Sequence, residues 1–69
     1  MATIKQIKID IIESLKDGLR DTNEVVEEIS YENQVSEQGV ELLIKEMAKL
    51  GWIIRYDGQI SLRYPYRSY

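Results

Sequence analysis

At Gly51 the hydrophobic pattern of this chain changes from the period of a helix to that of a β-strand. Before Gly51, apolar residues recur at intervals of three and four from Val40 to Leu50, which predicts a helix over about 36–50 with Ser36 as its N-cap. After Gly51, two runs rich in aromatic and β-branched residues flank Asp57-Gly58. Because Asp-Gly favours a two-residue turn with positive φ at both positions, we expect a β-hairpin over about 52–64.

The turn fixes which hairpin residues face the same way. Pairing outward from Asp57-Gly58 sets Tyr56 opposite Gln59 and Ile53 opposite Leu62. We assign the face with Ile53, Ile60 and Leu62 to the core. The opposite face is unusually aromatic for a surface in water, and an exposed patch of this kind favours a partner. It consists of Trp52, Ile54, Tyr56, Gln59, Ser61 and Arg63.

Two further helices are predicted ahead of this unit. An apolar stripe from Ile4 to Leu15 predicts helix one over about 3–17, closed by Gly18. Asp21 and Glu24 form a capping pair at the start of helix two, over about 22–30. We interpret residues 30–35 as an irregular connection and residues 65–69 as a tail. The expected fold class is therefore α+β, mostly α, in a single domain over 1–69.

Composition excludes most catalytic chemistry. The chain has no cysteine and no histidine, which removes disulfides, thiolate nucleophiles, usual zinc sites and a neutral-pH imidazole base. Asp10, Glu13 and Asp17 could form a metal or acid–base cluster, but a solvated helix face is the favoured alternative, because helical spacing separates them and no nucleophile lies nearby. We expect no enzyme activity, no cofactor and no metal. We also expect a cytoplasmic protein, since the chain has no signal peptide and no membrane-spanning run.

Charge is unevenly distributed along the chain. Residues 1–50 contain six basic and eleven acidic side chains, a balance of −5, whereas residues 51–69 contain three arginines and one aspartate, a balance of +2. The overall charge of −3 argues against strong nonspecific binding to phosphates. The hairpin and tail are the part of the chain best suited to an anionic partner.

The order of elements resembles the winged helix-turn-helix superfamily. The matching segments are 11–18 for helix one, 25–29 for helix two and 40–54 for helix three and the wing, with Lys49-Leu50-Gly51-Trp52-Ile53 at the junction. The resemblance implies three helices followed by a two-stranded β-hairpin wing. One departure is that Ser36 follows Ile29 by seven positions, where many relatives have a turn of three or four residues. Either helix two continues past Ser30 or the turn is expanded.

The resemblance also implies a nucleic-acid surface, with helix three in the major groove and the wing on phosphates. Gln38 suits adenine, Leu42 suits a thymine methyl group, and lysines suit phosphate. Glu37, Glu41 and Glu46 favour instead a solvated face that binds nothing, and an exposed Leu42 also suits a protein interface. The candidate residues are Gln38, Leu42, Lys45, Lys49, Arg55, Tyr56 and Gln59.

A second candidate surface is apolar and suits a dimer or another protein. Ile9 lies opposite the stripe of helix one and Ile12 lies on its flank, so a second contact is possible there. The aromatic hairpin face is the other place for such a contact, or it is covered by tyrosines of the chain's own tail. The candidate interface residues are Ile9, Ile12, Trp52, Ile54, Tyr64 and Tyr66.

These surfaces lead to two functional hypotheses. The first is a small sequence-specific regulator that binds double-stranded DNA as a homodimer, which the basic wing favours. The alternative is a winged-helix module that binds another protein in a larger assembly and no DNA, which the acidic balance and Leu42 favour. The fold alone does not decide between them.

Overall fold

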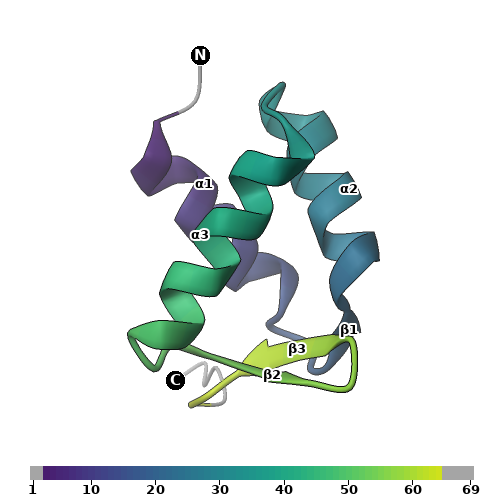
Figure 1. Ribbon diagram of the computed structural model, residues 1–69, viewed down its shortest axis with the longest axis vertical. Coiled ribbons are helices and arrows are strands. Elements are labelled where there is room, and N and C mark those ends of the chain that lie inside the picture. Colours follow the sequence, from purple (N-terminus) through teal and green to yellow (C-terminus); the bar gives the residue numbers. More distant parts are fainter. Residues whose placement is uncertain (1–2, 65–69) are drawn as a thin grey trace.

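A computed structural model describes residues 3–64 of the chain. Three helices lie above a small antiparallel sheet that closes one end of the helical layer (Figure 1). Within the described residues no helix has the length and apolarity to cross a bilayer. In chain order the elements are α1 (Ile4–Ser14), β1 (Arg20–Asp21), α2 (Thr22–Asn33), α3 (Glu37–Lys49), β2 (Ile53–Tyr56) and β3 (Gln59–Leu62).

Helix α1 is shorter at its C-terminal end than the predicted range of 3–17. Its N-cap is Thr3, whose hydroxyl oxygen accepts the backbone N–H of Gln6 at 3.1 Å. The helix ends at Ser14, because the Leu15 N–H bonds to Ile12 and the Gly18 N–H bonds to Leu15 in tight turns. The apolar stripe misled the prediction here, since Leu15 is buried although it lies just beyond the helix.

Helix α2 is longer than predicted, and it ends at Asn33 rather than near residue 30. Residues 30–33, the first part of the segment expected to be irregular, are helical, and Asn33 is held in place at the end of this extension. Its Nδ2 donates to the Ile29 carbonyl and to Asp10 Oδ2 of α1, each at 3.1 Å. Gln34 then adopts the left-handed conformation with φ 55° and stops the helix. Only residues 34–36 separate α2 from α3, so the turn is compact and not expanded.

Helix α3 agrees with its prediction to within one residue at each end. Ser36 is the N-cap, and its Oγ accepts the Gly39 N–H at 3.0 Å. Gly51 has φ 87°, a conformation that a residue with a Cβ rarely adopts, and it turns the chain from the helix into the hairpin. The buried face of α3 carries Val40, Ile44 and Met47.

The hairpin forms in the predicted register, with Tyr56 opposite Gln59 and Ile53 opposite Leu62. Both turn residues have positive φ, 52° at Asp57 and 77° at Gly58. The expected two-stranded unit gains a third strand, because β1 pairs antiparallel with β3 and gives the order β1-β3-β2. This strand was not predicted, and it ties the start of α2 to the hairpin.

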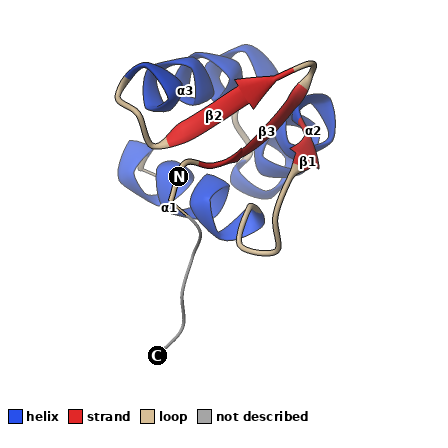
Figure 2. Cartoon of the chain, turned by 90° about the horizontal axis from the view of Figure 1, so that it is seen from below, coloured by secondary structure: helices blue, strands red, loops and turns tan. Residues whose placement is uncertain are grey.

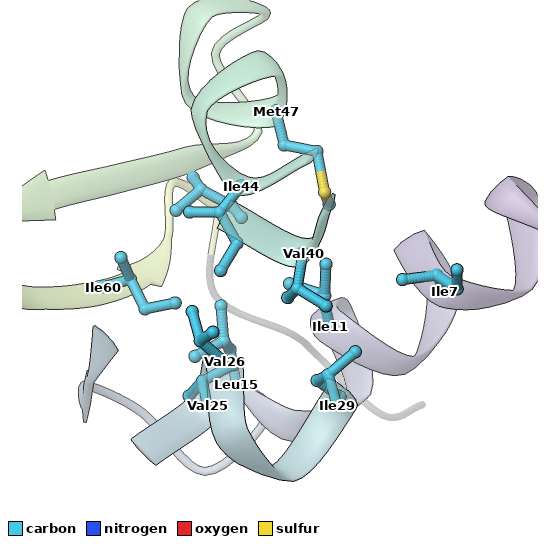
Figure 3. Close-up of a cluster of buried hydrophobic side chains, with 11 residues drawn as sticks. Ile7, Ile11, Leu15, Val25, Val26, Ile29, Val40, Ile44, Met47 and Ile60 are labelled. Carbon is cyan, nitrogen blue, oxygen red and sulfur yellow. The ribbon is translucent and has the colours of Figure 1, made fainter. Parts of the chain in front are cut away.

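One core joins the helices to the sheet. Figure 3 shows its side chains converging from all three helices and from β3. Ile53 and Ile60 are buried as the assignment of hairpin faces predicted, and Leu62 is partly buried against them. The buried apolar residues are Ile7, Ile11, Leu15, Val25, Val26, Ile29, Val40, Ile44, Met47, Ile53 and Ile60.

Candidate nucleic-acid interface

The outer surface of α3 is set by the position of its buried face. Because Val40, Ile44 and Met47 point inward, the opposite side of the helix points to solvent. Leu42 lies at the middle of this outer side and is 66% exposed, which is high for an apolar residue in the centre of a helix. Its exposed neighbours from the predicted set are Gln38, Lys45 and Lys49.

Arg55 of β2 joins this surface. The hairpin register places Arg55 opposite Ile60, on the side of the sheet that faces the helices. Arg55 stays exposed and borders a shallow hollow between β2 and α3. The hollow is lined by Gln38, Glu41, Leu42, Lys45 and Arg55. Sequence reasoning selected four of these residues separately, and the structure brings the four together. Lys49 lies one turn further along α3, outside this hollow.

A second hollow lies between the hairpin tip and the start of α2. Arg55, Tyr56 and Gln59 line it together with Thr22 and Asn23. The backbone N–H of Thr22 donates to the Gly58 carbonyl at 2.9 Å, so the hairpin turn is fixed against the N-terminus of α2. The hairpin tip is therefore held by the domain, and the candidate surface runs continuously from α3 through Arg55 to the tip.

Thr22 and Asn23 were missed by the sequence reasoning. Their place beside the hairpin depends on β1, which is only two residues long and carries no recognisable strand pattern. The capping role of Asp21 was the one available signal, because it fixes where α2 begins. Asp21 itself lines the hollow at the hairpin tip.

Both signs of charge occur on this surface. Lys45 and Arg55 are the cations that line its hollows, whereas Glu41 borders the hollow at α3 and Asp21 and Asp57 border the hollow at the hairpin tip. Within residues 3–64, neither Lys45 nor Arg55 makes a salt bridge or side-chain hydrogen bond. Their charged groups are thus available to a partner.

No protein-family model, no curated protein and no solved structure matches this chain.

The candidate apolar interface falls into separate regions. On α1, Ile9 is 39% exposed, whereas Ile12 is partly buried and packs against the core. Trp52 and Ile54 lie on the outer side of the sheet, which is in front of the helices in Figure 2, and both are exposed. Tyr64 is exposed with its ring 5.9 Å from the Arg63 guanidinium carbon. Tyr66 and the tail tyrosine Tyr69 lie outside the described residues.

Acidic residues of α1 and of the turn after it border a hollow on another side of the molecule. Asp10, Glu13 and Asp17 share it with Arg20, and Glu28 and Glu32 of α2 complete its charged lining. Helical spacing does not keep these carboxylates apart as expected, because Asp10 and Glu13, three positions apart, lie on one face of α1, and Asp17 follows in the turn beyond Ser14. Among the described residues no cluster has the arrangement of a metal site.

Proposed function

We propose that this chain is a winged helix-turn-helix protein that binds double-stranded DNA in a sequence-specific way and regulates transcription. The observation that carries this proposal is the hollow where Gln38, Leu42 and Lys45 of α3 meet Arg55 of the hairpin. The Gln38 amide and the Leu42 side chain suit base edges, and Lys45 and Arg55, which form no salt bridge within residues 3–64, suit phosphates. A cytoplasmic location belongs to the same proposal.

The connection between α2 and α3 supports this function. Only three residues separate the two helices, and the outer side of α3 is exposed. Compact members of the superfamily insert such a helix into the major groove while the wing contacts the backbone. In this arrangement Leu42 would meet the groove floor, and Arg55 would meet phosphate beside it.

We further propose that the protein acts as a homodimer. A single protomer offers few cations, and two copies on neighbouring half-sites would double the phosphate contacts. The outer sheet face at Trp52 and Ile54 is the favoured contact, because it is exposed and lies away from the helical layer (Figure 2). A dimer formed there leaves α3 accessible.

A module that binds protein instead of DNA is the second candidate. The specific observation in its favour is that Glu41 lies beside the exposed Leu42, on the surface where phosphates would have to approach. An apolar residue flanked by both signs of charge is a common arrangement at protein interfaces.

Fluorescence anisotropy with mixed-sequence duplex DNA, at low and moderate salt, separates the two candidates. A DNA-binding protein loses affinity steeply as salt rises, and Lys45→Ala or Arg55→Ala lowers the salt slope by about one each. Lys5→Ala is the matched control, because Lys5 is an exposed cation on α1 and lines neither of these hollows. Absence of binding at low salt would reject the DNA proposal and favour the protein-binding module.

A further inference from the structure

Among residues 3–64, Glu41 is the carboxylate of α3 that has neither a salt bridge nor a place in the first turn. Glu46 forms a salt bridge with Lys8 of α1 at 3.2 Å, and Glu37 lies in the first turn, where the helix dipole stabilises a negative charge. Glu41 lies beyond the first turn, is exposed, and makes no salt bridge within residues 3–64. Glu41 therefore has neither a capping role nor a salt-bridge contact among these residues, and Lys45, four positions on, is its nearest cation on the helix.

Its position is central to the candidate surface. Glu41 lines the hollow with Leu42, Lys45 and Arg55, and it also lines the adjoining hollow at Thr22 and Asn23. Any duplex that contacts Lys45 and Arg55 must come close to this carboxylate. A carboxylate is only a hydrogen-bond acceptor, so phosphate oxygens and the acceptor edges of guanine are repelled by it.

We infer that Glu41 determines the sequence specificity of this surface by accepting a hydrogen bond from the amino group of cytosine. This inference rests on the proposed DNA-binding function. In the major groove, cytosine presents an N4 amino donor that pairs well with a carboxylate. Guanine and thymine present no donor there and leave the negative charge unpaired near phosphates, and adenine sets its N6 donor beside the N7 acceptor, which repels a carboxylate. The same residue therefore rewards cytosine over the other bases.

The test begins with selection of binding sites from a randomised duplex library by the unmodified protein, Glu41→Gln and Glu32→Gln. Glu32→Gln is the matched control, because it removes the same charge from an exposed position at the acidic hollow of α1 and α2. Anisotropy then compares the selected duplex with one in which the cytosine pair is replaced by a T·A pair. Circular dichroism establishes that each variant is folded.

We expect the unmodified protein and Glu32→Gln to prefer the cytosine duplex by at least about fivefold, and Glu41→Gln to lose that preference. Glu41→Gln is also expected to bind unrelated duplex about threefold more tightly, since one repulsion is gone. A cytosine preference that persists in Glu41→Gln, or disappears equally in Glu32→Gln, would overturn the inference while leaving DNA binding intact. An unmodified protein that binds no duplex at low salt would overturn the proposed function and this inference with it.

Discussion

Two sides of the molecule are hollowed, and their charged groups are arranged differently. On the side of α1 and α2, five carboxylates surround Arg20, and several of these groups are bound within the protein. Arg20 donates to Glu24 and Glu28, and Asp10 accepts from Asn33 and Gln6. On the side of α3 and β2, Lys45, Arg55 and Glu41 have no such partner within residues 3–64.

The comparison shows why net charge is a poor guide to binding by this protein. Much of the negative charge lies on the side of α1 and α2, where hydrogen bonds and ion pairs give part of it a structural role. Charges that are satisfied inside a fold contribute to stability, whereas unpaired charges beside an exposed Leu42 are free to meet a partner. Mutations on the first side are therefore expected to change folding, and mutations on the second side to change binding.

The largest loss of stability is expected at Ile60, because the side of α1 and α2 and the side of α3 and β2 both pack around this residue. Ile60 is fully buried and lies opposite Arg20 on one strand and opposite Arg55 on the other. Ile60→Ala is expected to lower the free energy of unfolding by about 3 kcal/mol, and Ile60→Val by about 1 kcal/mol. Urea unfolding followed by Trp52 fluorescence and by circular dichroism measures this. Separate transitions for the two signals would show that the sides do not share one core.

A smaller loss is expected from Asn33→Ala on the acidic side. The change removes both hydrogen bonds of the Asn33 amide and leaves the partly buried Asp10 without that donor, so we expect a loss of about 1–2 kcal/mol. Tyr31→Ala is the control, since Tyr31 is 86% exposed on the same helix and its replacement is expected to change stability by less than about 0.5 kcal/mol. Equal effects in thermal unfolding would contradict a structural role for Asn33.

Arg20→Ala probes the ion pairs of the same side. Hydrogen bonds from Arg20 to Glu24, and then to Glu28, raise the pKa of the guanidinium above its usual value. Because this raises the pKa of a cation in the folded state, its contribution to stability is complete at neutral pH and is lost only as the pH rises through the folded-state pKa. For a partly exposed network we expect a loss of about 1 kcal/mol at low salt.

The dependence of stability on salt concentration is a second, independent test of the Arg20→Ala prediction. Without Arg20, the remaining carboxylates repel one another, so added NaCl is expected to stabilise Arg20→Ala more than the unmodified protein. Lys5→Ala removes a cation from outside the acidic hollow and is expected to show little of this effect. A salt response shared by both variants would mean that overall charge matters and the local network does not.

The hairpin register was predictable because local chemistry determines it. Asp57-Gly58 specifies the turn, and a slip of one residue would expose Ile53 and Ile60. The end of α2 was not predictable in this way. It depends on the bond between Asn33 and Asp10, which are 23 positions apart, and on a left-handed Gln34 where glycine or asparagine is usual.

The candidate surface, too, has a part that local sequence predicts and a part that depends on contacts between distant segments. Helical period alone identifies Gln38, Leu42 and Lys45 as the outer side of α3, because the buried positions are clear. The meeting of Arg55 with these residues depends on how the hairpin packs beneath α3. On the far side of the hairpin, β1 pairs with β3, and its two residues form a strand only once β3 is in place. No pattern within a segment encodes such a contact.

The smallest effect on stability is expected on the outer face of the sheet. Trp52 and Ile54 are 53% and 44% exposed, so Trp52→Ser with Ile54→Thr is expected to change monomer stability by only about 0.5 kcal/mol. If this face holds two protomers together, light scattering should show a dimer for the unmodified protein and a monomer for the double variant. Ile9→Thr on α1 is the control and is expected to remain dimeric. If the unmodified protein is monomeric at high micromolar concentration, the proposed dimer is wrong. DNA binding would then depend on the charges beside α3 in a single copy of the chain.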